Sequence, residues 1–222
     1  MAQRTILFDL DGTLTDSKPG ITRCVQHALA ELGVTVDDLD VLTPFVGPPL
    51  RESFARYYGF TDEQSLRAIA CYRERFASVG LFENAVYAGV PELLDALQRA
   101  GMTLAIASAK PAPFVDRILD HFALRSYFKV VAGASLDHTR ATKDSVIAHA
   151  LQELAPHPSH RLLMVGDREH DILGARTHGI ETVAVGYGYG TREELTAAAP
   201  LAIVDSVADL GEWLLAPAAN RG

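Results

Sequence analysis

The feature that most constrains this chain is a short apolar run near the N-terminus that ends in two carboxylates. Residues 5–8 are apolar and partly β-branched, which is typical of a buried strand, and Asp9, Asp11 and Gly12 follow at once. Burial and mutual repulsion disfavour two ionised carboxylates there, unless they share a cation or one stays protonated. An acidic cap or turn would explain one aspartate and the glycine, but not the whole run. The run therefore indicates chemistry.

Other reactive side chains recur where later apolar runs end. Residues 102–107 form a second run that stops at Ser108, and residues 161–165 form another that stops just before Gly166 and Asp167. Between them, Lys143 opens a stretch with apolar residues spaced for a buried helix face. Taken singly, a serine after a strand is usually a turn or cap, and a lysine in a first helical turn is usually solvated. Their order and spacing are what carry information.

These segments resemble the four motifs of the haloacid dehalogenase-like (HAD) phosphohydrolase superfamily, which occur in this order. The matching residues are Asp9-Leu10-Asp11-Gly12-Thr13 for the first motif, Ser108 for the second, Lys143 for the third, and Gly166-Asp167 with Asp171 for the fourth. The resemblance covers nearly the whole chain. It is closest to the phosphoglycolate phosphatase-like group and related nucleotidases, which carry a helical cap inserted after the first motif.

The chain departs from the superfamily pattern at two places. Ala109 stands where many relatives carry Asn or Ser, and Glu169-His170 precedes Asp171 where Asn is common. Neither departure removes a group that the chemistry requires.

The first half of the chain predicts an inserted helical domain. With 222 residues and 48% hydrophobic content, the chain is long for one domain and short for two full ones. Between Asp16 and about Tyr87 the apolar residues follow helical spacing, and Thr61 with Gln64 has the spacing of a capping box. We expect an all-helical cap at residues 17–87 and an α/β core formed by residues 1–16 and 88–222.

The rest of the chain alternates between strand and helix patterns, which predicts a parallel sheet. Helices are expected at residues 91–100, 113–122, 172–177 and 210–215 and from residue 143, and strands at 129–132 and 181–185, besides the runs above. The resemblance implies a Rossmann-like sheet of order 3-2-1-4-5. In that order the carboxyl ends of three central strands meet at the switch point where ligands bind, which brings Asp9, Ser108 and Asp167 together.

The resemblance also implies roles for the motif residues. Asp9 would be the nucleophile that forms an aspartyl-phosphate, and Asp11 would protonate the leaving oxygen and then activate water. Mg²⁺ would bridge enzyme and phosphate through Asp9, the backbone carbonyl of Asp11, and Asp167. Lys143 would add positive charge. The remaining expected site residues are Gly12, Ser108 and Ala109 for phosphate binding, and Thr13 and Asp171 as supporting residues.

Substrate choice is expected to lie in the cap, because the core motifs handle only the phosphoryl group. Arg51 follows a rigid turn at residues 45–50 and is the best candidate for binding a second anionic group; Lys18, at a hinge, is a weaker one. Ordinary helix punctuation with a solvated Arg51 explains the same pattern equally well.

Several functions fit these residues. The favoured one is a Mg²⁺-dependent phosphatase acting on a small phosphomonoester, either phosphoglycolate phosphatase-like or 5′-nucleotidase-like. A phosphoglucomutase-like isomerase would share Asp9 and Asp11, although mutase relatives usually carry Val in place of Thr13. A phosphatase for a sugar-phosphate biosynthetic intermediate and a non-catalytic binding protein are further alternatives. A dehalogenase is disfavoured because Asp11 would have no role there.

The charge and hydropathy of the chain argue against several classes of binding partner. A formal charge of −8 opposes nucleic acid polymers and anionic membranes. No stretch reaches the ~18 unbroken apolar residues of a membrane span, and the first strand begins too early for a signal peptide, so we expect a cytoplasmic protein. We also expect a monomer or a homodimer. The glycine-rich residues 186–190 match no nucleotide-binding fingerprint and predict only a loop near the rim of the site. His157 and His160 are expected to be exposed, and residues 217–222 frayed.

Overall fold

The computed structural model describes residues 4–137, 139–155 and 162–216. The expectations for four parts of the chain concern residues outside this range: His157, His160, Arg161 and the C-terminal residues 217–222. The chain divides into two compact units: one comprises residues up to Thr15 together with those from Val86 onward, and the other is Asp16–Ala85. Among the described residues, no helix has the length and apolar character needed to cross a bilayer.

The first unit is built on a six-stranded sheet in which all neighbouring strands run parallel. The strands occur in the order β5-β4-β1-β6-β7-β8. Numbered along the core, this is 3-2-1-4-5-6, so the expected order is confirmed and extended by one strand. The strands are β1 (Thr5–Phe8), β4 (Thr103–Pro111), β5 (Val130–Ala134), β6 (Leu162–Gly166), β7 (Glu181–Val185) and β8 (Ala202–Val204).

The register of the sheet aligns the ends of its central strands. Phe8, the last residue of β1, pairs with Ile106 of β4 on one side and Val165 of β6 on the other. The residues that follow these three positions therefore leave the same edge of the sheet side by side. Asp9 belongs to the first of these segments, Ser108 to the second and Asp167 to the third.

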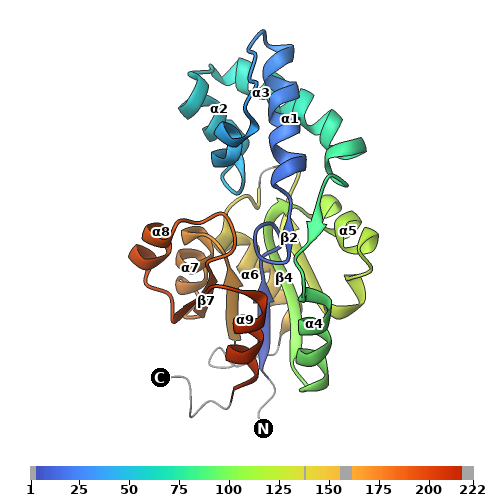
Figure 1. Cartoon of the computed structure of the whole chain (residues 1–222), viewed down its shortest axis with the longest axis vertical. Coiled ribbons are helices and arrows are strands. Elements are labelled where there is room, and N and C mark those ends of the chain that lie inside the picture. The colour runs from blue at the N-terminus through green and yellow to red at the C-terminus, as the bar shows by residue number, and fades with distance from the viewer. Residues whose placement is uncertain (1–3, 138, 156–161, 217–222) are drawn as a thin grey trace. The chain divides into compact units, whose positions relative to one another are not determined.

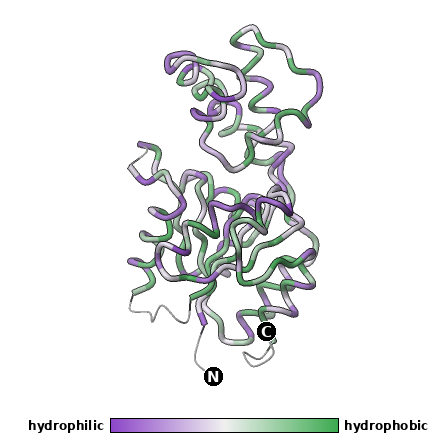
Figure 2. The backbone as a smooth tube through the Cα atoms, turned by 90° about the vertical axis from the view of Figure 1, so that its left-hand side faces the viewer, coloured by the Kyte–Doolittle hydropathy of each residue, from purple (hydrophilic) through white to green (hydrophobic). Residues whose placement is uncertain are grey.

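Helices pack against the sheet and bury its apolar side chains (Figure 1). The buried helix residues Val146 and Ile147 lie in one core cluster with Leu7, Ala105 and Met164 of the strands. Figure 2, coloured by hydropathy, shows hydrophobic and hydrophilic stretches alternating along the chain. The helices of this unit are α4 (Val90–Arg99), α5 (Ala112–His121), the short 3₁₀ helix η3 (Arg125–Tyr127), α6 (Lys143–Leu154), α7 (Glu169–Arg176), α8 (Arg192–Ala198) and α9 (Val207–Leu215).

The structure differs from the predicted elements in places that have physical reasons. β8 is only three residues long, and α8 buries just Leu195 and Ala198, so neither left a periodic pattern to read in the sequence. α7 begins at Glu169, earlier than predicted, because the Asp171 carboxylate accepts the backbone N–H of Arg168 at 3.1 Å and caps the first turn.

The second unit is helical apart from the two-residue strand β2 (Thr15–Asp16), which pairs with β3 (Ala85–Val86) where the two units join. α1 packs against α3. The predicted capping box is present: the Gln64 N–H donates to Thr61 Oγ1 at 3.3 Å, and the Thr61 N–H donates to Gln64 Oε1 at 2.9 Å. The helices are α1 (Lys18–Glu31), the 3₁₀ helix η1 (Leu39–Phe45), α2 (Leu50–Tyr58), α3 (Asp62–Arg75) and the π-helical turn η2 (Phe76–Gly80).

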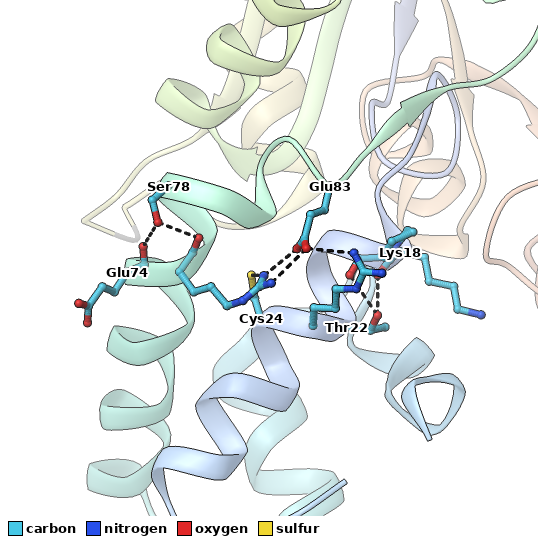
Figure 3. A network of polar contacts seen from close by, with 9 residues as sticks. Lys18, Thr22, Cys24, Glu74, Ser78 and Glu83 are labelled. Carbon is cyan, nitrogen blue, oxygen red and sulfur yellow. Dashed lines mark hydrogen bonds and ion pairs between the residues drawn. The ribbon is translucent and has the colours of Figure 1, made fainter. Parts of the chain in front are cut away.

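A partly buried polar network ties the two ends of this helical unit together (Figure 3). Glu83 accepts hydrogen bonds from Arg75 at 2.7 and 3.1 Å and from Arg23 at 3.0 Å. Arg75 also donates to the buried Cys24 Sγ at 3.1 Å. Arg75 lowers the pKa of Glu83 by hydrogen bonding, against the effect of burial. The network therefore links α1, the end of α3 and the segment that returns to the first unit.

Replacing Glu83 by Gln should lower the free energy of unfolding by roughly 1 kcal/mol at neutral pH, since both arginines lose a charged partner. Because the folded-state pKa of Glu83 lies below its ordinary value of 4.5, this stability is present above about that pH and is lost as the pH falls through the folded pKa. Urea unfolding at neutral and acid pH measures the difference. Asp62→Asn is the control, because Asp62 pairs with Arg51 on the exposed surface of the same unit. Equal losses in the two variants would contradict the prediction.

Candidate active site

The first site residue, Asp9, is held at the end of β1 by the neighbouring strand. Its backbone N–H donates to Val165 O at 2.9 Å, and only 8% of the residue is exposed. A tight turn follows, in which the N–H of Gly12 donates to Thr15 O at 2.8 Å. Gly12 has φ +80°, and a Cβ there would lie 2.2 Å from Asp167 Oδ2. Glycine is therefore required both for the turn and for the close approach of Asp167.

Lys143 reaches this point from the first turn of α6. Its Nζ lies 2.8 Å from Asp9 Oδ1 and 2.7 Å from Asp171 Oδ1, and it donates to Ala107 O at 3.0 Å. The side chain is almost fully buried. Burial alone would lower the pKa of Lys143, but the charges of Asp171 and Asp9 outweigh it and raise the pKa above its ordinary value. The lysine therefore stays protonated and supplies a fixed positive charge.

Asp9 belongs to a group of three buried carboxylates, two of which pair with this charge. Asp9, Asp167 and Asp171 each offer an oxygen, and these oxygens lie within 4.8 Å of one another. Burial, followed by the charges of neighbouring carboxylates, raises the pKa of Asp167. The pKa of Asp171 is also raised, mainly by burial. A single ammonium group does not balance three ionised carboxylates, so full ionisation of the cluster would require a further positive charge.

The cluster fits a divalent cation. Asp167 Oδ1 is buried and has no hydrogen-bond partner within the described part of the chain, although such an atom is costly to leave unsatisfied. All donors in the cluster are carboxylate oxygens, which are the ligands of hard cations such as Mg²⁺. Asp171, expected only as a supporting residue, belongs to the cluster by its own carboxylate.

The side chain of Asp11 lies in a second ion pair. Lys110 Nζ is 3.0 Å from Asp11 Oδ2, and both side chains are largely buried. The sequence pattern assigned Lys110 no role, although it stands two residues after Ser108. That position was the signal that could have identified it.

Ser108 lies inside β4, next to the carbonyl that anchors Lys143. It is 1% exposed, and its Oγ accepts the N–H of Lys110 at 3.3 Å. Ala109, the next residue, is partly buried. Thr13 is fully buried in the turn after Asp9. The structure therefore places Ser108 and Ala109 in the C-terminal half of β4, and Thr13 in the turn that follows β1.

The two cap candidates lie in the helical unit. Arg51 forms a bidentate pair with Asp62, at 2.6 and 3.2 Å, on the exposed surface. Lys18 Nζ lies 2.8 Å from Asp40 Oδ1. Both cations thus already have carboxylate partners within their own unit.

The glycine-rich loop makes contacts that the sequence pattern did not predict. The Tyr189 N–H donates to Asp167 Oδ2 at 2.7 Å, and the Tyr187 hydroxyl donates to Thr13 O at 2.9 Å. The repeated glycines were the only sequence signal for this loop.

Comparison with known proteins gives consistent matches. Residues 6–185 match the family model of the haloacid dehalogenase-like hydrolases. A 5′-nucleotidase of Pseudomonas aeruginosa is 49% identical over 88% of this chain and 88% of its own length. The tyrosine-protein kinase PtkA of Mycobacterium tuberculosis is 47% identical over 83% of this chain, which spans 62% of that protein. The crystal structure of a predicted phosphatase from Clostridium acetobutylicum superposes with a TM-score of 0.92 at 43% identity, covering 97% of this chain and 99% of that one.

Replacing Lys143 by Met should lower the free energy of unfolding by about 3 kcal/mol in metal-free buffer, because it leaves buried carboxylates without their counter-charge. The double variant Lys143→Met, Asp171→Asn should recover much of this loss, since one of the unbalanced charges is gone as well. Urea unfolding measures both, and Lys129→Met, at an exposed position of the same unit, serves as the control. Wild-type stability of the single variant would show that Lys143 does not balance the cluster.

Proposed function

The chain belongs to the haloacid dehalogenase-like hydrolase family and is a phosphatase, and we propose that it hydrolyses a small phosphomonoester through an aspartyl-phosphate on Asp9, with nucleoside 5′-monophosphates as first candidates. The observation that carries this proposal is the placement of the buried Asp9 carboxylate 2.8 Å from the Lys143 ammonium group, inside a cluster of carboxylates. That arrangement places the positive charge of Lys143 directly against the proposed nucleophile.

Binding the substrate is first a problem of charge. A phosphomonoester carries about two negative charges, and a carboxylate cannot approach it unaided. A Mg²⁺ ion held by Asp9, Asp167 and the backbone carbonyl of Asp11, with Asp171 beside them, would neutralise phosphoryl charge. Lys143 supplies the second positive charge, and the Ser108 hydroxyl with the backbone N–H of Ala109 binds phosphoryl oxygens. The N–H of Gly12 is used within the turn, so Gly12 contributes mainly its shape.

Two steps then complete the reaction. In the first, an oxygen of Asp9 bonds to phosphorus while the bond to the ester oxygen breaks, and Asp11 gives that oxygen its proton. In the second, Asp11 accepts a proton from water, the water oxygen bonds to phosphorus, and the bond to Asp9 breaks. The ion pair with Lys110 holds the carboxylate form of Asp11, which is the form that accepts the proton in the second step; the first step starts from protonated Asp11. Inorganic phosphate and the alcohol are the products.

The similarity to a 5′-nucleotidase supports a nucleoside as the leaving group. Phosphoglycolate and sugar phosphates remain alternatives from the sequence pattern. The similarity to PtkA supports a second candidate function, in which a protein tyrosine hydroxyl takes the place of water as the phosphoryl acceptor. The two functions share the Asp9 chemistry and differ in the phosphoryl donor, which would be ATP for the kinase, and in the acceptor.

Asp9→Asn should lower phosphate release by about 10⁴-fold or more, because the amide is a poor nucleophile. The variant should remain folded, because Lys143 keeps its ion pair with Asp171 and the amide keeps the shape of the side chain. Phosphate release and circular dichroism measure the two effects. Turnover retained by a folded variant would exclude the covalent mechanism.

A panel of phosphate esters, assayed with Mg²⁺ and after chelation by EDTA, tests the metal and the substrate class together. Chelation should reduce turnover by about a hundredfold or more, and added Mg²⁺ should restore it. We expect the highest kcat/KM for a nucleoside 5′-monophosphate, compared with 2-phosphoglycolate and sugar phosphates. A parallel incubation with ATP and a tyrosine-containing protein tests transfer to tyrosine. Full activity in EDTA would contradict the metal requirement.

A further inference from the structure

We propose that the glycine loop, residues 187–190, is a clamp that holds the carboxylate of Asp167 in the orientation that binds a divalent cation. This inference rests on the function proposed above for the carboxylate cluster and adds to it a positioning element from a distant part of the sequence. None of the loop residues is among the ligands proposed above for the phosphate or the cation. They act through Asp167.

The two carboxylate oxygens of Asp167 have different surroundings. The backbone N–H of Tyr189 donates to Oδ2 at 2.7 Å, so the loop fixes one oxygen of the carboxylate. The other oxygen, Oδ1, is buried and has no hydrogen-bond partner in the part of the chain that the structure describes. The cluster of Asp9, Asp167 and Asp171 supplies the remaining surroundings for a cation. One hydrogen bond from the loop thereby leaves one oxygen available for the cation.

The loop packs so closely against Asp167 that two of its residues have no room for a side chain. A Cβ on Gly188 would lie 2.4 Å from both Asp167 Cβ and Gly12 O, and a Cβ on Gly190 would lie 2.1 Å from Asp167 O. Neither glycine has a φ in the left-handed range, so the backbone conformation itself would admit other residues. Glycine is required at both positions because the loop lies directly against Asp167. A loop that merely bordered the site would not need this contact.

The loop is anchored to the sheet and to the turn that follows β1. Before the loop, the N–H of Gly186 donates to Val204 O of β8 at 2.7 Å. Within the loop, the Tyr187 hydroxyl donates to Thr13 O at 2.9 Å, and its ring packs edge-on against Tyr87 with centroids 5.1 Å apart. The loop is therefore tied both to the sheet and to the turn that carries Asp9 and Asp11. It connects the first-motif turn with Asp167 of the fourth motif.

Cation affinity is the property that should respond to the loop. Groups that orient a metal ligand typically contribute about 10- to 100-fold to affinity. Gly188→Ala and Gly190→Ala should therefore raise the Kd for Mn²⁺, measured on the substrate-free protein by the electron paramagnetic resonance of free Mn²⁺, by about 10- to 100-fold.

Gly186→Ala is the matched control, because it adds the same methyl group to the adjoining residue. Its Cβ would meet only the Oδ1 atom of Asp205 within 3 Å, at 2.7 Å, and that carboxylate lies on an exposed side chain that can move. Its Kd should stay within about twofold of the wild type, which is the spread expected for a contact that does not reach a metal ligand.

Tyr187→Phe tests the anchor without adding atoms, and should raise the Kd in the same direction but less. If the alanine variants fail to fold, as judged by circular dichroism, this variant decides the question. Raising the Mn²⁺ concentration should restore kcat in the folded variants, which general damage to the site would not allow. An unchanged Kd in folded Gly188→Ala and Gly190→Ala, or in Tyr187→Phe where those do not fold, would overturn the clamp.

The metal readout separates this inference from the proposed function. A wild-type protein that binds Mn²⁺ with a Kd sensitive to the loop, yet hydrolyses no ester, would refute the function and support the clamp. A wild-type protein that hydrolyses esters and binds Mn²⁺ with a Kd insensitive to the loop would refute the clamp alone. A wild-type protein that binds no divalent cation would overturn both.

Discussion

The structure of the site depends on one buried ammonium group. Lys143 lies within ion-pair distance of both Asp9 and Asp171, and its hydrogen bond to Ala107 O ties α6 to β4 at the same point. Without that charge, Asp9 and Asp171 would be buried without their counter-charge, at a cost of about 3 kcal/mol. With it, one positive charge faces the group of three carboxylates, so the fully ionised cluster could still take up a divalent cation. The lysine therefore makes the cluster tolerable to the fold while leaving it able to bind a metal.

The parallel sheet explains why charged residues that are far apart in the sequence lie in one cluster. β1 lies between β4 and β6, and the register puts Phe8 beside Ile106 and Val165. Whatever follows these residues must leave the sheet at the same edge. The core thus brings together the carboxylate of Asp9, the hydroxyl of Ser108 and the carboxylate of Asp167 without any long-range device beyond strand pairing. This economy fits a site that handles only the phosphoryl group and leaves recognition of the rest of the substrate to other parts of the chain.

Much of this arrangement could be predicted from the sequence, because strong apolar runs ending in polar residues report directly on buried parallel strands. The strand order and the meeting of Asp9, Lys143 and Asp167 follow from such runs together with the resemblance. The short edge strand β8 and the helix α8 could not be predicted, since each buries too few residues to show a period. Lys110 was missed for a different reason: a lysine near a strand end is usually solvated, and only the fold shows that it pairs with Asp11.

The glycine loop shows a further limit of sequence reasoning. A glycine required for a left-handed turn, such as Gly12, can be anticipated from local motif chemistry, because the requirement lies within its own backbone. Gly188 is required by atoms of Asp167 and Gly12, which lie at least twenty residues away in the sequence. The sequence of the loop gives no sign of these contacts, so it predicts only a loop near the rim of the site. Once Asp167 is placed against the loop, the same glycines support the proposal that a segment outside every motif holds this carboxylate in place.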